Sequence, residues 1–246
     1  MSIYHLPVWG LFKEFADEVL KDPNNIFEKR DAISWFQKKY PDIKKATVDA
    51  HLKVMSTNRN GRTHHHLKEY HNVFFFLGQG KYRRYHPEND PAPIMSKGDI
   101  APHNETDSDS IDDNDDEGKF AYEKDLENYL LKNINDIEDG LKLYENEGIT
   151  GQQFPCGGRW IDILAVDHQD SLVVIELKVD RGHEKVVGQI CRYIAWIRDN
   201  FANEGQHVRG IIIGHEISED LRLACSMVED VSLREYSISF SLNQVN

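Results

Sequence analysis

Cysteine and long apolar stretches are both scarce in this sequence. The three cysteines, Cys156, Cys191 and Cys225, stand far apart and form no CxxC pair, which argues against a disulfide framework or a zinc knuckle and predicts reduced thiols. No run approaches the roughly 18 apolar residues that a membrane helix needs. The first ten residues contain no basic region followed by an apolar stretch, so they do not predict a secretory signal. We therefore expect a cytoplasmic protein with no membrane partner.

Basic residues are almost absent from one segment. Residues 87–118 hold one Lys or Arg against 11 Asp and Glu, with four prolines. Such a segment cannot offset the entropy of ordering, and its like charges extend it. It predicts a flexible acidic linker between two domains, 1–86 and 119–246. The alternative is a decoy that competes with DNA for residues 1–86, which are basic, with 15 Lys and Arg against 9 Asp and Glu.

Apolar spacing before the linker predicts three helices followed by a hairpin with a Gly78-Gln79-Gly80 turn. The helices are expected at Val8–Leu20, Glu28–Lys39 and Ala46–Ser56, and the strands at Asn72–Leu77 and Lys81–Tyr85. This order is that of a winged helix-turn-helix. Phe74 and Phe76 are expected in its core rather than stacked on bases.

Basic side chains surround the third predicted helix and the hairpin, which suits phosphate contacts with a helix in the major groove. The predicted DNA-binding residues are Lys45, Lys53, Arg59, Arg62, Lys81, Arg83 and Arg84. Winged helices also serve as protein-interaction modules, so that alternative stays open. The run His64-His65-His66 predicts a polar loop, because consecutive residues cannot converge on one zinc ion with good geometry.

The sequence after the linker predicts a mixed β-sheet with helices on its faces. Helices are expected at Glu123–Asn135, Glu184–Asn200 and Ser218–Met227, and strands at Gly140–Asn146, Arg159–Val166, Ser171–Lys178, His207–Ile213 and Ser232–Leu242. Side chains alternate along a strand, so Glu176 and Lys178 share one face at the end of an apolar run. If this strand pairs with the preceding one, Asp162 lies near Glu176.

Two close carboxylates repel each other, and a hard divalent cation relieves the repulsion through oxygen ligands. Asp162 and Glu176 are therefore predicted ligands of Mg²⁺, with Mn²⁺ as a substitute. A cation held in this way activates a water and offsets the charge on a phosphate. Lys178 is expected to position that water or to stabilise the same charge. The alternative for Glu176 and Lys178 is a structural ion pair.

The ordered motifs resemble the PD-(D/E)XK nuclease superfamily with its restriction-endonuclease-like fold. They resemble more narrowly the RecB-like catalytic domain of NucS/EndoMS-type endonucleases. The resemblance covers roughly residues 120–215 and is carried by Asp162, by Glu176-Leu177-Lys178 and by segments 125–130, 137–143, 158–165 and 188–193. It implies catalytic roles for Asp162, Glu176, Lys178, Glu127, Gln189 and Tyr193. For Glu127, Gln189 and Tyr193 the alternative is a solvated helix surface.

The resemblance stops at the linker, because NucS proteins carry a β-rich N-terminal domain where this chain predicts a winged helix. It therefore implies DNA cutting without implying mismatch recognition. We expect a Mg²⁺-dependent DNA endonuclease of the restriction type, including the modification-dependent kind. One site per chain cuts one strand, so a homodimer on double-stranded DNA is expected. The alternatives are a NucS-like repair endonuclease and a catalytically silent DNA-binding regulator.

Overall fold

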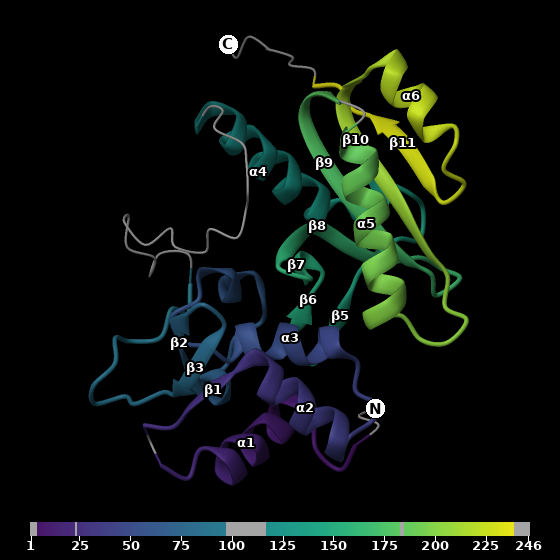
Figure 1. The fold of residues 1–246 in the computed structure, drawn as a ribbon. Helices are drawn as coiled ribbons and strands as arrows, with labels where there is room; N and C mark the ends of the chain where they lie inside the picture. The colour runs from purple at the N-terminus through teal and green to yellow at the C-terminus, as the bar shows by residue number, and fades with distance from the viewer. Residues whose placement is uncertain (1–3, 23, 97–116, 183–184, 239–246) are drawn as a thin grey trace, which may run out of the picture.

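The N-terminal part of the chain folds into three helices and a small antiparallel sheet (Figure 1). The computed structural model describes residues 4–22, 24–96, 117–182 and 185–238. The elements here are α1 (Val8–Val19), β1 (Ile26–Glu28), α2 (Lys29–Lys39), α3 (Lys45–Val54), β2 (Phe74–Gly78) and β3 (Lys81–Arg84), with short 3-10 helices η1 (Asn60–His64) and η2 (Glu69–His71). Strand order is β1-β3-β2. The predicted helices and hairpin are confirmed, whereas the short strand β1 was not predicted.

Aromatic side chains fill the core of this N-terminal domain. Phe12, Phe15, Phe36 and Phe74 are fully buried, and the rings of Phe12 and Phe36 lie 4.5 Å apart between centroids. Helix α1 contributes two of these rings because residues three apart share a helix face. The expectation that Phe74 belongs to the core is confirmed, and Phe76 packs partly buried against the same cluster.

A mixed β-sheet forms the centre of the C-terminal domain. Its strands are β4 (Lys142–Leu143), β7 (Gln152–Cys156), β8 (Arg159–Val166), β9 (Leu172–Gly182), β10 (Val208–Ile217) and β11 (Val231–Glu235). The order is β11-β10-β9-β8-β4, with β7 also pairing with β8. Strands β9, β10 and β11 run parallel, and β8 is antiparallel to β9. A separate small hairpin joins β5 (Glu145–Asn146) to β6 (Ile149–Thr150).

Helices cover both faces of this sheet, as predicted (Figure 1). Helix α4 (Glu117–Lys132) packs on the face that carries Val173 and Ile175. Helices α5 (Lys185–Asn200) and α6 (Glu219–Cys225) pack on the face that carries Leu172 and Val174. Glu176 continues the second face, because strand side chains alternate. Within the described ranges, no helix is both long and apolar enough to cross a membrane.

Several predicted boundaries differ from the structure. Strand β9 continues to Gly182 and β10 to Ile217, whereas β11 already ends at Glu235. The strand expected at 140–146 is divided into β4 and β5, and β7 was not predicted, because Pro155 interrupts its strand pattern. Helix α4 already begins at Glu117, inside the predicted linker. Residues 97–116, which hold most of the acidic segment, and the predicted strand beyond residue 238 lie outside the described residues.

The first residues of the predicted linker pack back on the N-terminal domain. Arg83 Nη1 donates to Asp90 Oδ2 at 2.7 Å, and the backbone N–H of Ile94 donates to the carbonyl of Thr57 at 2.9 Å. The described part of the segment from Pro87 onward therefore starts as an ordered extension of the domain before it.

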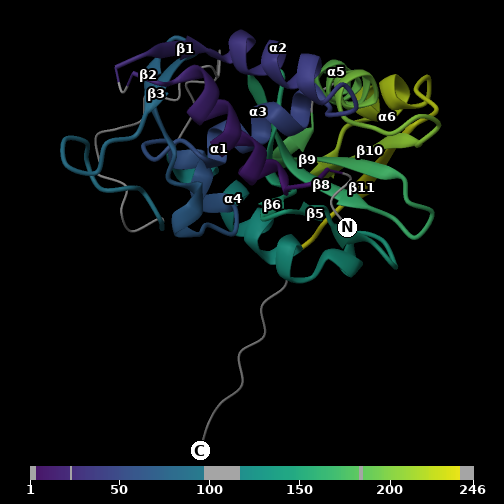
Figure 2. The same ribbon diagram turned by 90° about the horizontal axis from the view of Figure 1, so that it is seen from below.

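Helix α3 lies at the boundary between the two domains, as Figures 1 and 2 both show. Its residues Ala50 and Val54 belong to the same buried cluster as Phe154 and Tyr193 of the C-terminal domain. Lys53 Nζ lies 3.9 Å from the centroid of the Trp160 ring. The predicted recognition helix is therefore covered by the C-terminal domain, and its buried face is not available to a DNA groove in this arrangement.

Candidate active site

Asp162 lies where strands β8 and β9 diverge. Their ladder runs from Val166↔Leu172 to Ile163↔Ile175, so the predicted pairing is confirmed. Beyond it, Asp162 Oδ2 accepts a hydrogen bond from the backbone N–H of Leu177 at 2.8 Å. Burial raises the pKa of Asp162 well above its ordinary value, and the negative charge of Glu176 raises it further. The two carboxylates are therefore close enough to repel each other, as expected.

Glu176 and Lys178 form an ion pair at the edge of this site. Lys178 Nζ lies 3.0 Å from Glu176 Oε1. The carboxylate is buried, whereas the lysine side chain is 34% exposed. The pair thus places a carboxylate inside the domain and an ammonium where solvent or a ligand reaches it.

Glu127 points from α4 into the same site. It is buried, so the interpretation as a solvated helix residue is wrong. Gln152 Nε2 donates to Glu127 Oε1 at 2.6 Å. Gln153 Nε2 donates to Glu127 Oε2 and also lies 3.5 Å from Asp162 Oδ1.

Gln152 and Gln153 were not predicted as site residues. Adjacent side chains in a regular strand point to opposite faces, so a sequence pattern does not place both on one carboxylate. Here Gln153 has a φ of 46°, in the left-handed region. This break in the alternation lets both amides reach Glu127. The sequence feature that could have indicated these two site residues is the pair of successive glutamines directly before Phe154, which is buried.

Gln189 and Tyr193 lie on one face of α5, as their spacing predicts. Gln189 Nε2 donates to the Tyr193 hydroxyl at 3.1 Å. Tyr193 is buried, so it is not a surface residue. Burial raises the pKa of Tyr193, and the charge of Glu176 raises it further. The phenol therefore stays protonated near the carboxylates.

The donor set fits a hard divalent cation. Asp162, Glu176 and Glu127 offer only carboxylate oxygens, which Mg²⁺ and Mn²⁺ accept. Within the part of the chain that the structure describes, no three His, Cys, Asp or Glu residues form a complete ligand cluster. Mg²⁺ is usually held by one or two carboxylates, with waters and substrate phosphate completing its shell. Asp162 and Glu176 are sufficient for such a site.

Two of the predicted DNA-binding residues, Lys53 and Arg62, are buried. Arg62 is fully buried, and its Nη2 donates to Asn72 Oδ1 at 2.8 Å. Lys53 is buried against Trp160. Neither side chain reaches a DNA phosphate in this arrangement, because Lys53 packs against Trp160 of the C-terminal domain and Arg62 is fully buried beside Asn72.

The other predicted DNA-binding residues remain at least partly exposed. Lys45 and Lys81 are exposed. Arg83 pairs with Asp90 and Arg84 with Asp17, while the Arg59 guanidinium lies over the Phe76 ring.

The three histidines of residues 64–66 contribute to the contact between the domains. His65 Nδ1 accepts a hydrogen bond from the backbone N–H of Thr150 at 3.1 Å. The exposed His66 Nδ1 lies 3.0 Å from Glu145 Oε1. The polar loop that the sequence predicts thus meets the β5–β6 hairpin of the C-terminal domain.

Comparison with known proteins separates the two halves of the chain. Residues 7–84 match a domain of unknown function, DUF7669, and residues 122–241 match the endonuclease NucS C-terminal domain. The chain is 31% identical to endonuclease NucS of Sulfolobus acidocaldarius over 120 residues, which cover 49% of this chain and 43% of that protein. It is 30% identical to endonuclease NucS of Pyrococcus furiosus over 97 residues, or 39% of this chain and 33% of that protein.

Solved structures give a weaker likeness. A repair endonuclease from Pyrococcus abyssi matches with a TM-score of 0.39 and 24% identity, over 52% of this chain and 49% of that chain. An EndoMS–double-stranded DNA complex matches with a TM-score of 0.39 and 17% identity, over 65% of this chain and 52% of that chain. The chain spans less than half the length of the two curated relatives. Its C-terminal domain is NucS-like, with a restriction-endonuclease-like fold.

Proposed function

We propose that this chain is a metal-dependent DNA endonuclease of the NucS repair type. The observation that carries the proposal is the convergence of Asp162, Glu176 and Lys178 from two paired strands. Glu127 adds a third carboxylate from α4. The name of the curated relatives supports a nuclease that cuts within a chain.

Each side chain of the candidate site has its own proposed role in phosphodiester hydrolysis. Asp162 and Glu176 would hold Mg²⁺, or Mn²⁺ in its place, which when bound activates a water and offsets negative charge on the phosphate. Lys178 lies at the exposed edge, where its ammonium can orient the attacking water and stabilise the same charge. Gln153 holds Glu127 near Asp162 and so fixes the spacing of the carboxylates.

The N-terminal domain is proposed to be a winged-helix DNA-binding module. The element order and the β1-β3-β2 sheet support this assignment. Because α3 is covered, phosphate contacts fall to exposed cations outside its buried face, of which Lys45 and Lys81 are the clearest. Double-stranded DNA remains the proposed substrate.

Restriction is the second candidate role. The similarity to curated NucS endonucleases favours the NucS-like alternative over the restriction role that the sequence first suggested. One observation keeps restriction open: residues 7–84 match a family different from NucS, and target choice depends on the DNA-reading part. Mismatched, methylated and plain duplexes, followed by sequencing of the cut ends, separate the two roles. Preferred cutting at mismatches supports repair, and cutting that depends on methylation supports restriction.

Cutting itself is tested on plasmid DNA with Mg²⁺ or Mn²⁺, against EDTA. We expect Asp162→Ala to lower the rate at least about 100-fold, because it removes a proposed metal ligand and the charge it carries. DNA binding measured in EDTA should remain. Tight binding by the wild-type protein without cutting under either metal would contradict the proposal and favour the silent regulator.

The predicted homodimer is tested with the same substrate. One site cuts one strand, so a dimer on DNA gives linear product and a monomer gives nicked circles first. Sedimentation of the protein with and without a short duplex measures the stoichiometry directly.

A further inference from the structure

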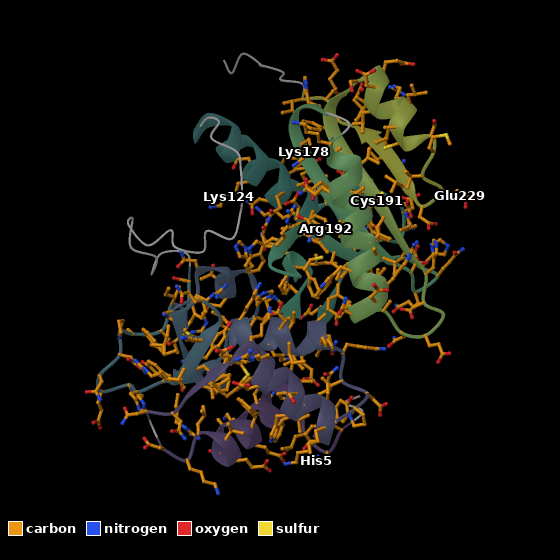
Figure 3. The ribbon with its side chains drawn as sticks, in the orientation of Figure 1. His5, Lys124, Lys178, Cys191, Arg192 and Glu229 are labelled. Carbon is orange, nitrogen blue, oxygen red and sulfur yellow. The ribbon has the colours of Figure 1, made fainter. Side chains whose placement is uncertain are left out.

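A pocket lies at the boundary between the two domains, beside the proposed catalytic carboxylates. We call it the boundary pocket, and its lining residues come from η1, β7 and β8: Asn60, Gly61, His64, Gln153 and Trp160. All five are partly exposed, so a ligand can enter the pocket from solvent. Figure 3 shows side chains of the two domains meeting between α3 and the sheet, below the labelled Lys178.

Two lining residues connect the boundary pocket to the catalytic site. Gln153 Nε2 donates to Glu127 Oε2 and lies 3.5 Å from Asp162 Oδ1. Trp160 precedes Asp162 by two residues in β8, and both are partly exposed whereas Ile161 between them is buried, so they face the same open side of the strand. Two strand residues span about 7 Å, and DNA rises about 3.4 Å per nucleotide along each strand. A nucleotide in the pocket therefore lies about two nucleotides from the cut.

The lining of the boundary pocket favours a neutral, planar ligand over a phosphate. None of the described residues that line it is a lysine or an arginine, and the carboxylates of Glu127 and Asp162 next to Gln153 repel an anion. The indole of Trp160 offers a surface for stacking. The amides of Asn60 and Gln153 offer hydrogen-bond donors and acceptors. An aromatic ring with a polar edge, as in a nucleobase, matches both features.

The two residues nearest the carboxylates can each bind such a ring. Lys53 Nζ lies 3.9 Å from the centroid of the Trp160 ring and occupies one of its faces, so a base can stack only on the other. Among the described residues, Trp160 Nε1 and Gln153 Oε1 have no hydrogen-bond partner. They leave one donor and one acceptor for a base, whose edge carries both kinds of group.

The size of the boundary pocket distinguishes between the two kinds of base. Its volume is ≈ 180 Å³. A cavity of about 150 Å³ accommodates a benzene ring, so the pocket has room for one six-membered ring with its substituents. The two fused rings of a purine would protrude from it.

We propose that the boundary pocket takes one unstacked pyrimidine base from the DNA strand next to the cut site, stacked on Trp160 and hydrogen-bonded by Gln153. The inference rests on the proposed nuclease function and adds a specificity site to it. One wall of the pocket comes from η1, whose domain matches a family separate from NucS, so the site depends on the pairing of these two domains. Because unstacking a base costs least where it is already unpaired, the pocket favours DNA with an unpaired pyrimidine near the cut.

The test measures binding of the full chain, in EDTA, to three short duplexes that differ at one unpaired position. This position carries thymine, adenine or an abasic sugar. The wild type should bind the thymine duplex about tenfold more tightly than the abasic duplex, as one base–aromatic stack predicts. The adenine duplex should gain less, because the pocket holds a single ring.

Substitutions in the boundary pocket should remove this preference. Trp160→Leu should bring the thymine and abasic affinities together, whereas Trp160→Phe should keep part of the difference. Gly61→Ala should also reduce it, because the added Cβ would lie 2.8 Å from Trp160 Cη2 and narrow the pocket. Trp196→Leu is the matched control, since Trp196 is also partly exposed but does not line the pocket, and it should leave the preference unchanged.

The ratio of the two affinities separates binding from folding. A variant that only folds poorly loses affinity for both duplexes equally, so its ratio stays that of the wild type. Equal thymine and abasic affinities in the wild type, a ratio that survives Trp160→Leu, or a larger gain from adenine than from thymine would overturn the assignment. Failure of the wild-type protein to cut plasmid DNA would refute the nuclease proposal instead, since these binding measurements do not depend on cutting.

Discussion

At the scale of single residues, Asp162 shows how position sets the chemistry of a carboxylate. It accepts from the Leu177 N–H at the point where two strands separate. Burial and the charge of Glu176 raise its pKa. An ionised carboxylate held in this way destabilises the metal-free fold, and this cost is relieved when a cation is bound.

We expect Asp162→Asn to raise the free energy of unfolding of the metal-free protein at neutral pH. The folded protein binds the Asp162 proton more tightly than the unfolded chain does. The wild type therefore loses stability as pH rises from the ordinary value of 3.8 through the raised folded pKa. The advantage of the variant should shrink as pH falls toward 3.8.

Urea denaturation in EDTA at several pH values measures this difference. Asp199→Asn, which removes a carboxylate from the exposed side of α5, is the matched control. A difference between Asp162→Asn and wild type that stays constant with pH would show that the charge of Asp162 is not the cause.

At the scale of secondary-structure elements, the distance between α5 and the sheet decides where Tyr193 lies. Gly210 of β10 permits the close approach. A Cβ at this position would lie 2.7 Å from Ile190 Cδ1 and 2.9 Å from Ile194 Cδ1. Both isoleucines are buried, so there is little room for them to move. Either these side-chain ends or the helix that holds Gln189 and Tyr193 would have to shift.

Gly210→Ala should therefore destabilise the protein by about 1–3 kcal/mol, as overpacking of a core does, and should slow DNA cutting although Gly210 is not a proposed site residue. Gly188→Ala on α5 is the opposite case. Its added Cβ meets nothing within 4 Å, so the variant should gain up to about 1 kcal/mol from helix propensity. Urea unfolding of both variants checks the pair, and equal effects would contradict the packing explanation.

At the scale of the whole molecule, buried histidines line the contact between the domains. The ring Nε2 of His51, on α3, lies 3.8 Å from Glu147 Oε2. His65 accepts from Thr150. Burial lowers the pKa of His51 to about 4 and that of His65 to about 3. The domains are thus joined through rings that are neutral at physiological pH.

Stability should fall as pH drops from about 6.5 toward 4. In this window the unfolded chain binds protons that the folded protein does not, so each buried histidine contributes a slope of up to about 1.4 kcal/mol per pH unit. His65→Asn keeps an acceptor for Thr150 but cannot take up a proton, so its slope should be smaller than that of the wild type. Chemical denaturation across this range measures both slopes, and identical slopes would contradict the role of His65.

The sequence by itself determined the helices and the pairing of the two strands that carry Asp162 and Glu176. The alternation around Glu176 and Lys178 fixed their shared face, because side chains in a strand alternate whatever surrounds them. The pairing of β8 with β9 was also predictable, since a short turn at 167–170 joins them. Such features depend on contacts that are near in sequence.

Only the tertiary structure decided which charged and polar side chains remain accessible and which are buried. Lys53 and Arg62 carry the charge expected of DNA-binding residues, yet Lys53 is buried against Trp160 of the other domain and Arg62 is buried beside Asn72. The amides of Gln152 and Gln153 meet Glu127 only because one left-handed residue breaks the strand pattern. Charge and periodicity are local properties of the chain, whereas burial depends on which distant segment packs against a surface.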